Sequence, residues 1–379
     1  MTESNKHIVT NKACISLNNL VYNLEQIRNK VDPCELMAVV KADAYGHGLI
    51  QVADRLKQEG IKYWAVARLQ EALELIDHGC DGRILIFGRL FQEELKKALQ
   101  ENIRITLTCP GDLELIAELA RELGKDAYIH INVDSGMGRT GLFPEEAVTT
   151  ILKAVNTDNI RVEGLYSHFS TADMGDKSYA MVQLERFKKL VKEVRDNDVE
   201  IPCIHMANGG AILDIPESYQ GIFNMVRTGI ILYGYYPSLE TSESIPLKQV
   251  MTLKSRVLEL RNVPANYPIS YGCRYKSLEP ITVAVLPIGY ADGILRSFTN
   301  NTSVMIKGET YPIIGAVTMD QIMVAVDNQV EEGDEVIFWG SSGPNQLRAS
   351  KVAAETGTIS YELTCSVSTR VRKIYDEEC

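Results

Sequence analysis

Short strand-like runs alternate with helical segments through the first two thirds of this 379-residue chain, and this alternation constrains the fold most strongly. Helical periodicity separates the runs, as in Gly111–Leu123 and Ser178–Val194. The predicted strands are Leu36–Val40, Trp64–Ala67, Ile84–Phe87, Ile103–Thr108, Ala127–Val133, Val162–Ser167, Cys203–Met206 and Asn224–Val226. Strands that alternate with helices pair in parallel, so the pattern predicts an α/β fold, a closed (β/α)8 barrel of the TIM type. An open doubly wound sheet is the structural alternative.

The pattern changes after about residue 246, where strand-like runs follow one another without long helices between them. Turn-forming residues separate the runs, including Asn300–Asn301 and Glu332–Asp334. The runs are Val250–Leu258, Ile281–Leu286, Ser303–Ile306, Tyr311–Ala316, Gln321–Val326 and Glu335–Trp339. We therefore expect two domains, a barrel over residues 1–246 and a mostly β domain over residues 247–379.

Composition and charge limit the class of protein. With a net charge of -11 at pH 7, the chain is not expected to bind nucleic acid or an anionic membrane as its main partner. Its 8 cysteines are scattered without a CxxC pair, which indicates reduced thiols, and the dispersed histidines predict no structural metal site. No apolar run is long enough to span a bilayer and no signal peptide opens the chain. We expect a cytoplasmic protein, or the cytoplasmic domain of a longer membrane-anchored one.

A lysine follows the first predicted strand directly. Lys41 closes the apolar run Leu36–Val40, and the turn Ala42–Gly48 separates it from a helix-period segment that starts at Leu49. A lysine at the carboxyl end of a buried strand can keep its stem in the protein and its amine in an opening. Desolvation there lowers the pKa and makes the amine a nucleophile. Position alone also fits a solvated lysine that ends a strand.

Polar residues also end other predicted strands, and the carboxyl ends of barrel strands share one rim, where active sites of this fold lie. They are Asn132 and Arg139 around the fifth strand, His168 after the sixth, Asn208, Gly209 and Gly210 after the seventh, and Arg227 and Gly229 at the eighth. The glycines would let backbone N–H groups approach an anion, and a short helix beginning near Gly210 would add its dipole. This predicts a phosphate site, with an ordinary loop as the alternative.

Taken together, these segments resemble the alanine racemase family over almost the whole chain. The matching segments are Lys41–Gly48, Asp134–Arg139, Tyr166–Phe169, Val226–Gly229, Ser270–Gly272, Ile288–Gly293 and Met319–Gln321. The resemblance implies an enzyme that racemises a small amino acid with pyridoxal 5'-phosphate (PLP) as its cofactor. It also implies a homodimer whose subunits share their active sites. Lys41 would form the Schiff base with PLP.

The resemblance assigns roles to individual residues. Lys41 would be one catalytic base, and Tyr271 would be the second, reaching the cofactor from the β domain of a partner subunit. His168 would hydrogen-bond Tyr271 and link it to Arg227. The residues that would bind the cofactor are Lys41, Tyr45 at the phosphate, Arg139 at a ring oxygen, His168, Asn208, Gly209, Arg227, Gly229 and Ile230. Those that would contact the substrate are Arg139, Tyr290 at the entrance, Met319 through its backbone, Asp320 and Thr369.

Arg227 matches the arginine that faces the pyridine nitrogen of PLP in this family. An arginine has no acceptor, so it favours an unprotonated ring nitrogen, a weaker electron sink and a short-lived carbanion at Cα, which suits racemisation. One alternative is a PLP-dependent decarboxylase of the same fold type, which places a carboxylate at the nitrogen. Another is a non-catalytic PLP-binding protein built on the barrel alone, against which the β-rich region with Tyr271 argues.

Two positions depart from the usual family pattern. Asn132 stands where the family commonly has a carbamylated lysine that orients the neighbouring arginine, so Arg139 needs other compensation, such as a chloride ion or a carboxylate. Thr369 stands where the family has a tyrosine that crowds the substrate side chain. The smaller residue resembles that of alanine/serine racemases associated with vancomycin resistance, which predicts L- and D-serine as further substrates. A neutral local substitution is the alternative.

Overall fold

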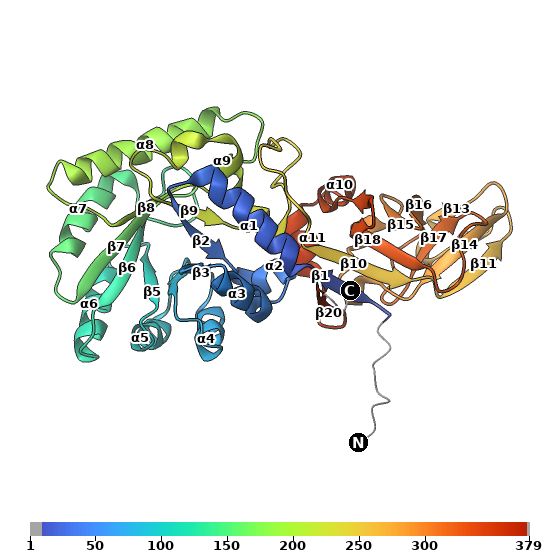
Figure 1. The fold of residues 1–379 in the computed structure, drawn as a ribbon, viewed down its shortest axis with the longest axis horizontal. Coiled ribbons are helices and arrows are strands. Elements are labelled where there is room, and N and C mark those ends of the chain that lie inside the picture. Colours follow the sequence, from blue (N-terminus) through green and yellow to red (C-terminus); the bar gives the residue numbers. More distant parts are fainter. Residues whose placement is uncertain (1–9, 377–379) are drawn as a thin grey trace, which may run out of the picture.

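The computed structural model describes residues 10–376, which form a barrel and a β-rich part side by side (Figure 1). Eight parallel strands close the barrel in the order in which they follow along the chain, so the predicted (β/α)8 barrel is confirmed and the open sheet is excluded. The barrel strands are β2 (Glu35–Val39), β3 (Tyr63–Val66), β4 (Arg83–Ile86), β5 (Arg104–Leu107), β6 (Ala127–Asn132), β7 (Ile160–Tyr166), β8 (Cys203–His205) and β9 (Met225–Thr228).

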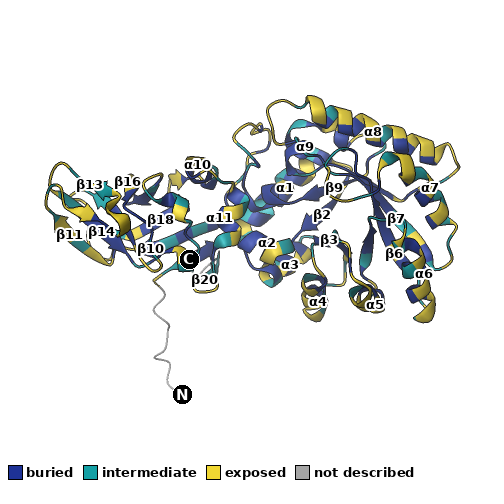
Figure 2. Cartoon of the chain, turned by 180° about the vertical axis from the view of Figure 1, so that it is seen from behind, coloured by how far each residue is buried: buried dark blue, intermediate teal, exposed yellow. Residues whose placement is uncertain are grey.

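Helices surround these strands and expose their polar faces, as the yellow outer surfaces in Figure 2 show. The predicted helix Ser178–Val194 is α8, and its apolar residues Leu184, Phe187 and Val191 are buried as expected. The helical segments of the barrel are α1 (Leu17–Val31), α2 (Lys41–Gly46), α3 (Leu49–Gln58), α4 (Leu69–Asp77), α5 (Gln92–Gln100), α6 (Asp112–Glu122), α7 (Pro144–Val155), α8 (Ser178–Arg195), α9 (Gly209–Asp214), η1 (Pro216–Ser218) and η2 (Ile230–Tyr233). No helix among residues 10–376 has the length and apolar character that crossing a membrane requires.

The second part is mostly β, as predicted. A 10-stranded sheet has the order β11-β14-β17-β16-β15-β18-β10-β1-β20, with β19 paired to β18, and β12 and β13 form a separate hairpin. The strands are β1 (Lys12–Ile15), β10 (Met251–Arg256), β11 (Glu259–Val263), β12 (Pro268–Ile269), β13 (Tyr275–Lys276), β14 (Ile281–Leu286), β15 (Ser303–Ile306), β16 (Glu309–Ile314), β17 (Ile322–Val326), β18 (Glu335–Ser342), β19 (Asn345–Leu347) and β20 (Arg372–Tyr375). Its helical segments are η3 (Tyr271–Cys273), η4 (Tyr290–Asp292), η5 (Arg296–Phe298), α10 (Ala349–Glu355) and α11 (Ser360–Ser366).

Two features of this sheet differ from the expectation. The predicted run Val250–Leu258 is the strand β10, which ends at Arg256 and pairs with β18, but the sequence did not predict β11, which begins at Glu259 and pairs with β14. The N-terminal strand β1, which the division at residue 246 assigns to the barrel, pairs with β10 and β20 of the sheet. The first and last strands of the described residues, β1 and β20, therefore lie next to each other in the β part.

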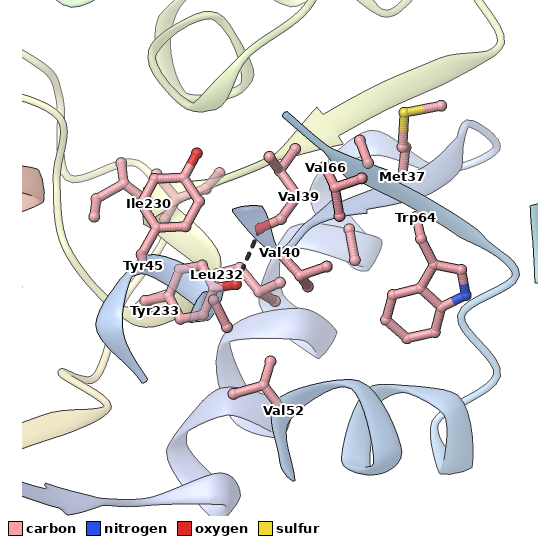
Figure 3. Close-up of a cluster of buried hydrophobic side chains, with 14 of the residues drawn as sticks. Met37, Val39, Val40, Tyr45, Val52, Trp64, Val66, Ile230, Leu232 and Tyr233 are labelled. Atoms are coloured by element: carbon pink, nitrogen blue, oxygen red, sulfur yellow. Dashed lines mark hydrogen bonds between the residues drawn. The ribbon is translucent and has the colours of Figure 1, made fainter. Parts of the chain in front are cut away.

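A buried apolar cluster supports the strand that leads to Lys41 (Figure 3). The Tyr233 hydroxyl of η2 donates a hydrogen bond of 3.0 Å to the carbonyl of Val39, the last residue of β2. The rings of Tyr233 and Tyr45 lie 5.1 Å apart, with Ile230 beside Tyr45 in Figure 3. Packing and a hydrogen bond thus fix the end of β2.

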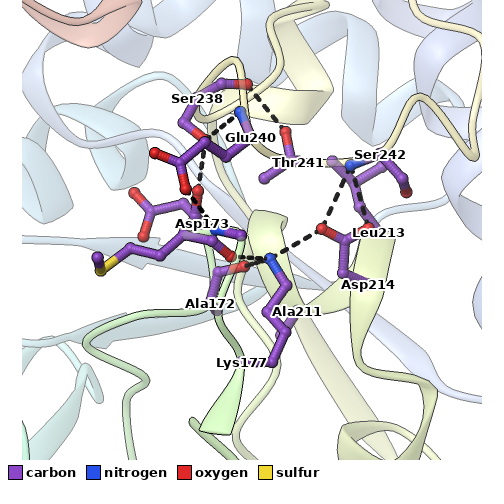
Figure 4. A network of polar contacts seen from close by, with 12 residues as sticks. Ala172, Asp173, Lys177, Ala211, Leu213, Asp214, Ser238, Glu240, Thr241 and Ser242 are labelled. Atoms are coloured by element: carbon purple, nitrogen blue, oxygen red, sulfur yellow. Dashed lines mark hydrogen bonds and ion pairs between the residues drawn. The ribbon is translucent and has the colours of Figure 1, made fainter. Parts of the chain in front are cut away.

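A polar network fixes the loop that follows β7 (Figure 4). Lys177 donates to the carbonyl of Ala172 at 3.0 Å and pairs with the Asp214 carboxylate at 3.0 Å. Glu240 accepts a hydrogen bond of 2.5 Å from the backbone N–H of Gly175. These contacts join the loop to the end of α9 and to the segment after η2, which steadies the chain on both sides of the barrel rim.

Candidate active site

A cavity of 440 Å³ opens at the carboxyl ends of the barrel strands, on the rim where the sequence predicts the active site. Every residue expected to bind the cofactor lines it: Lys41, Tyr45, Arg139, His168, Asn208, Gly209, Arg227, Gly229 and Ile230. A wider hollow of 760 Å³ on the outer surface, between α7 and α8, contains none of these residues. The barrel rim is therefore the candidate active site.

Lys41 begins a turn of unusual handedness. The four residues after it, Ala42 to Tyr45, all have φ between 52° and 55°, in the left-handed helical region. Each residue other than glycine costs about 1–2 kcal/mol there relative to a right-handed turn. Such a segment persists only where its surroundings hold it. The sequence predicted a turn at this place but not its handedness.

Contacts from the barrel and from the β part hold this left-handed turn. The Asp43 carboxylate accepts a hydrogen bond of 2.7 Å from the backbone N–H of Leu49 and pairs with Lys373 of β20 at 2.6 Å. The Glu71 carboxylate, at the start of α4, accepts from the backbone N–H of Ala42 at 2.6 Å. The backbone that carries Lys41 is therefore fixed from two sides.

The surroundings of Lys41 also tune its amine. Burial lowers the pKa of Lys41, and the Arg139 guanidinium lowers it further, whereas the Glu71 carboxylate acts in the opposite direction. A lowered pKa increases the unprotonated fraction at neutral pH, which is the nucleophilic form. These groups support the assignment of Lys41 as the nucleophile and base.

Arg227 is 3% exposed, and the hydrogen bonds of its guanidinium within residues 10–376 all go to neutral acceptors. Its Nη1 donates to Nδ1 of His205 at 2.9 Å and to the His205 carbonyl at 3.2 Å. Its Nη2 donates to Nδ1 of His168 at 3.1 Å and to the carbonyls of Ser167 and Met206 at 2.8 and 2.9 Å. Burial lowers the pKa of Arg227 to about 10, so the group stays charged at neutral pH. Its Nε–H has no acceptor in the described part of the chain.

The guanidinium fixes the tautomers of two buried histidines. Because Arg227 can only donate, Nδ1 of His205 accepts and its proton lies on Nε2, 3.0 Å from Nδ1 of His130. His130 then directs its own Nε2–H toward Glu163, 3.7 Å away. Burial alone would raise the pKa of Glu163, but the opposite effect of His130 and Arg104 is larger and lowers this pKa to about 2. A polar chain thus runs through the barrel interior from this carboxylate to the cavity.

His168 lies between Arg227 and the open part of the cavity. Burial lowers the pKa of His168 well below its ordinary value, and Arg227 and Arg139 act in the same direction. The ring is therefore neutral near pH 7, and its Nδ1 accepts from Arg227. That leaves the Nε2–H of His168 available to a partner in the cavity, such as a hydroxyl group.

Arg139 follows a loop built around one carboxylate. Asp134 accepts hydrogen bonds of 2.7 to 3.2 Å from the backbone N–H groups of residues 136–139. Asn132 donates to the carbonyl of Thr140 at 3.1 Å and does not contact Arg139. Among residues 10–376, the Arg139 guanidinium has no hydrogen-bond or ion-pair partner. The positive charge of Arg139 is thus available to an anion.

Small residues and a tyrosine line another side of the cavity. Helix α9 begins at Gly209, after Asn208, whose side chain accepts from the backbone N–H of Ala211 at 3.1 Å. The first N–H groups of a helix have no partner within it. A Cβ on Gly229 would lie 2.8 Å from the Tyr45 hydroxyl, so glycine leaves this space open. Burial raises the pKa of Tyr45, which keeps its hydroxyl protonated.

The other predicted catalytic residue lies in the β part and does not line the cavity of its own chain. Tyr271 begins η3, and its side chain is 78% exposed. The Ser270 hydroxyl donates to the carbonyl of Ala316 at 2.7 Å and holds the preceding backbone against β16. Tyr271 is therefore fixed at its backbone and free at its ring.

The predicted substrate residues of the β part form a second group. The backbone N–H of Tyr290 donates to the carbonyl of Thr318 at 2.9 Å, which places Tyr290 next to the segment that contains Met319. Asp320 pairs with Arg370 at 2.9 Å, and Arg370 directly follows Thr369. Tyr290 is 43% exposed and Met319 is 53% exposed. None of these residues lines the 440 Å³ cavity.

Several aromatic residues lie in or beside the site although the sequence did not predict them there. Tyr361 of α11 lines the cavity, with its ring 5.9 Å from that of Tyr45. The Tyr166 ring lies 5.3 Å from the Arg227 guanidinium and stacks on His205 at 4.9 Å. Tyr166 and His205 end barrel strands, the same signal that marked His168, whereas Tyr361 carries no such signal.

Comparisons with known proteins agree with this geometry. A model of the alanine racemase N-terminal domain matches residues 15–237, and a model of the alanine racemase C-terminal domain matches residues 250–375. The chain is 42% identical over 366 residues to an alanine racemase of Methanococcus maripaludis, covering 95% of this chain and 97% of that protein.

Solved structures are similar over nearly the whole chain. An alanine racemase of Clostridium difficile 630 has a TM-score of 0.90 and 38% identity, covering 98% of this chain and 96% of that chain. An alanine racemase from Bartonella henselae, described with covalently bound pyridoxal phosphate, has a TM-score of 0.88 and 29% identity, covering 97% of this chain and 99% of that chain.

Proposed function

The chain belongs to the alanine racemase family, and we propose that it interconverts L- and D-alanine with PLP as its cofactor. The observation that carries this proposal is the presence of Lys41 and Arg227 in one cavity. An amine with a lowered pKa suits attachment to a carbonyl cofactor. A decarboxylase of the same fold type would place a carboxylate at the ring nitrogen, whereas the cavity of this chain has Arg227, whose acceptors within residues 10–376 are imidazoles and carbonyls.

The cavity residues fit PLP at three points. Lys41 would hold its carbonyl carbon, the unused Nε–H of Arg227 would donate to its ring nitrogen, and the Tyr45 hydroxyl with the space over Gly209 and Gly229 would hold its phosphate. When bound, PLP supplies an electron-withdrawing ring that stabilises negative charge at the Cα of an attached amino acid.

Arg227 would limit how far the negative charge at Cα is delocalised into the cofactor ring. It has donors only and stays protonated, so a ring nitrogen that faces it keeps its lone pair. The neutral histidines on both sides of the guanidinium cannot supply the missing proton, because burial lowers the pKa of each well below its ordinary value. This environment favours rapid return of a proton to Cα over longer-lived side reactions.

Inversion at Cα requires a proton acceptor and a proton donor on opposite faces. Lys41 supplies one face. We assign the other to Tyr271 of a partner subunit in a homodimer, because Tyr271 is 78% exposed in its own chain and the Nε2–H of His168 has no partner among residues 10–376. Tyr267, 59% exposed, and Leu278, 85% exposed, add apolar area near Tyr271 for such an interface.

The substrate is a small amino acid, and the two groups of residues suggest how it is held. Arg139, whose guanidinium has no protein partner within residues 10–376, would face its carboxylate or a cofactor oxygen, together with the backbone at Met319. Tyr290, Asp320 and Thr369 would line the approach from the partner subunit. Threonine in place of a ring leaves space and a hydroxyl for serine, so we extend the proposed substrates to L- and D-serine.

Two further assignments belong to this proposal. The domain division at residue 246 separates the two matched segments, with β1 joining the second domain through its strand pairing. We place the protein in the cytoplasm, because all cysteines among residues 10–376 are free thiols, as is typical of reducing compartments.

Two measurements test the function. Purified protein should be yellow, and borohydride reduction followed by peptide mapping should label Lys41. Incubation with L-alanine, and separately with L-serine, should yield the D-enantiomer in chiral chromatography. A label on another lysine would contradict the assignment of Lys41, and absence of D-alanine would contradict the racemase activity itself.

A further inference from the structure

Glu71 joins the start of a helix to the backbone beside Lys41. Its Oε2 accepts hydrogen bonds from the backbone N–H groups of Ala67 at 2.8 Å and Arg68 at 3.0 Å, which closes the N-terminus of α4. Its Oε1 accepts from the backbone N–H of Ala42 at 2.6 Å. Because Ala42 directly follows Lys41, one carboxylate holds both the helix and the peptide group that adjoins this lysine.

The same helix position elsewhere in the barrel lacks this second contact. Glu94 of α5 accepts from the backbone N–H of Phe91 at 3.0 Å, and Glu146 of α7 accepts from that of Phe143 at 3.2 Å. Like Glu71, neither glutamate lines the cavity, and within residues 10–376 the carboxylate of each accepts only this one hydrogen bond. Closing a helix thus needs only one of the two carboxylate oxygens, and Glu71 uses the other on the turn that follows Lys41.

The contact lies where the backbone most needs support. Ala42 is the first of the four left-handed residues, and its φ of 53° departs from the ordinary range of an alanine. The Asp43–Lys373 pair holds the middle of the turn, so it leaves the peptide between Lys41 and Ala42 to another partner. The direction of that peptide sets where the Lys41 side chain leaves the backbone.

Glu71 also belongs to the set of titratable groups that face Lys41. These groups are Arg139 from the loop after β6, His168 from the loop after β7, Cys365 from α11 and Glu71 from α4. Arg139 is a cation without a partner in the described part of the chain, and burial keeps His168 neutral. Glu71 is the carboxylate of this set, and it favours the protonated amine that Arg139 disfavours.

We propose that Glu71 is a positioning residue for Lys41, which it orients through the Ala42 N–H group and whose charge it balances against Arg139. The proposal rests on the proposed role of Lys41 as cofactor anchor and base. Proton transfer at Cα is sensitive to placement, and a misplacement of about 1 Å can cost on the order of 100-fold in rate.

The test compares Glu71→Gln with Glu94→Gln, a matched control that removes a carboxylate at the same helix position away from the cavity. The first readout uses protein freed of PLP: the rate at which acetic anhydride labels Lys41, followed by peptide mapping across pH, gives the pKa of the amine. We expect a lower pKa in Glu71→Gln and the wild-type value in Glu94→Gln. PLP should also bind Glu71→Gln about tenfold more weakly, since one charge-assisted hydrogen bond is lost.

The holoenzyme gives the second readout. Glu71→Gln should lower kcat for alanine about 10- to 100-fold with KM changed by less than about threefold, because ground-state binding does not involve Glu71. With Cα-deuterated alanine, the isotope effect should rise for the enantiomer whose proton Lys41 removes. Glu71→Asp keeps the charge on a shorter side chain, so it should keep the labelling pKa near the wild-type value while kcat still falls.

The possible outcomes distinguish a failure of the role proposed for Glu71 from a failure of the proposed racemase activity. Equal labelling pKa and equal kcat in Glu71→Gln and Glu94→Gln would overturn the role of Glu71 while the racemase activity stands. Equal losses of kcat in both variants, with matching losses of thermal stability, would also overturn it, because helix closure would then explain the effect. If the wild-type protein does not racemise alanine, the proposed function fails, yet the labelling pKa still reports on Glu71.

Discussion

The barrel and the β domain contribute to the proposed active site in opposite ways. In the barrel, Lys41, Arg227 and His168 line one cavity, and buried hydrogen bonds fix the arginine and its histidine neighbours. In the β domain, Tyr271 and Met319 are exposed and do not line this cavity. The barrel forms its part of the proposed site from residues of one chain, whereas the β domain has its proposed site residues exposed on its surface.

This difference follows from what each half must do. Holding a charged cofactor requires groups whose charges and tautomers are set before binding, which burial and a closed network provide. In the proposed homodimer, the base on the opposite face comes from another molecule, and the exposure of Tyr271 lets it reach that site. We infer that the barrel determines which cofactor binds, and that the β domain completes the stereochemistry only in an assembled dimer.

The largest expected effect comes from the exposed half. Tyr271→Phe removes one hydroxyl and should lower racemisation by about 10²- to 10⁴-fold, the usual cost of losing a general base. PLP absorbance and the dimer should persist, because the barrel cavity does not include this residue. Steady-state rates with both enantiomers, together with sedimentation velocity, check this. Unchanged turnover would show that the β domain supplies no base through Tyr271.

Acid should weaken the barrel more than the β domain. The chain has 6 histidines, all before residue 206. Burial lowers the pKa of His47 to about 4, and the pKa values of His130, His168 and His205 are also lowered. A histidine kept neutral by folding takes up a proton on unfolding, so stability is lost as pH falls from about 6.5 towards the folded pKa.

For His47 alone this amounts to about 2 kcal/mol of unfolding free energy at pH 5 relative to pH 8. Hydrogen exchange, corrected for the intrinsic effect of pH, should therefore show lost protection in β2, β6 and β8 before the 10-stranded sheet. Equal loss in both domains would mean that the buried histidines do not govern the acid response.

The smallest effect concerns the substrate side chain. If Thr369 leaves space and a hydroxyl partner for serine, serine should be racemised within about tenfold to a hundredfold of alanine. Thr369→Tyr should then lower kcat/KM for serine more than for alanine, since burying the serine hydroxyl without a partner costs roughly 1–3 kcal/mol. Equal responses of the two substrates, or no turnover of serine, would leave Thr369 without a role in specificity.

The sequence predicted the barrel well because parallel strands covered on both faces leave short apolar runs, such as Ile84–Phe87 for β4. It missed β11, whose residues Glu259–Val263 are largely polar and partly exposed, and β1 and β20, which pair across most of the chain length. Short polar strands carry little periodicity, and long-range pairing leaves no local signal.

Some features of the candidate site could also be predicted from the sequence, and others could not. Lys41, His168 and Arg227 could be found because strand ends converge on one rim. The left-handed turn could not, because alanine and tyrosine disfavour positive φ and surrounding contacts impose it on four consecutive residues. Glu71 appears in the sequence as an ordinary acidic residue in the first turn of a helix, and its contact with Ala42 exists only in the folded chain.

The most direct test of the shared site is a hybrid dimer of Lys41→Ala and Tyr271→Phe subunits, purified through a different affinity tag on each. Each variant alone should be nearly inactive. In the hybrid, one of the two sites combines an intact Lys41 with an intact Tyr271, so we expect about half of the wild-type activity per dimer. A hybrid as inactive as its parents would place both bases in one chain and would rule out the shared active site.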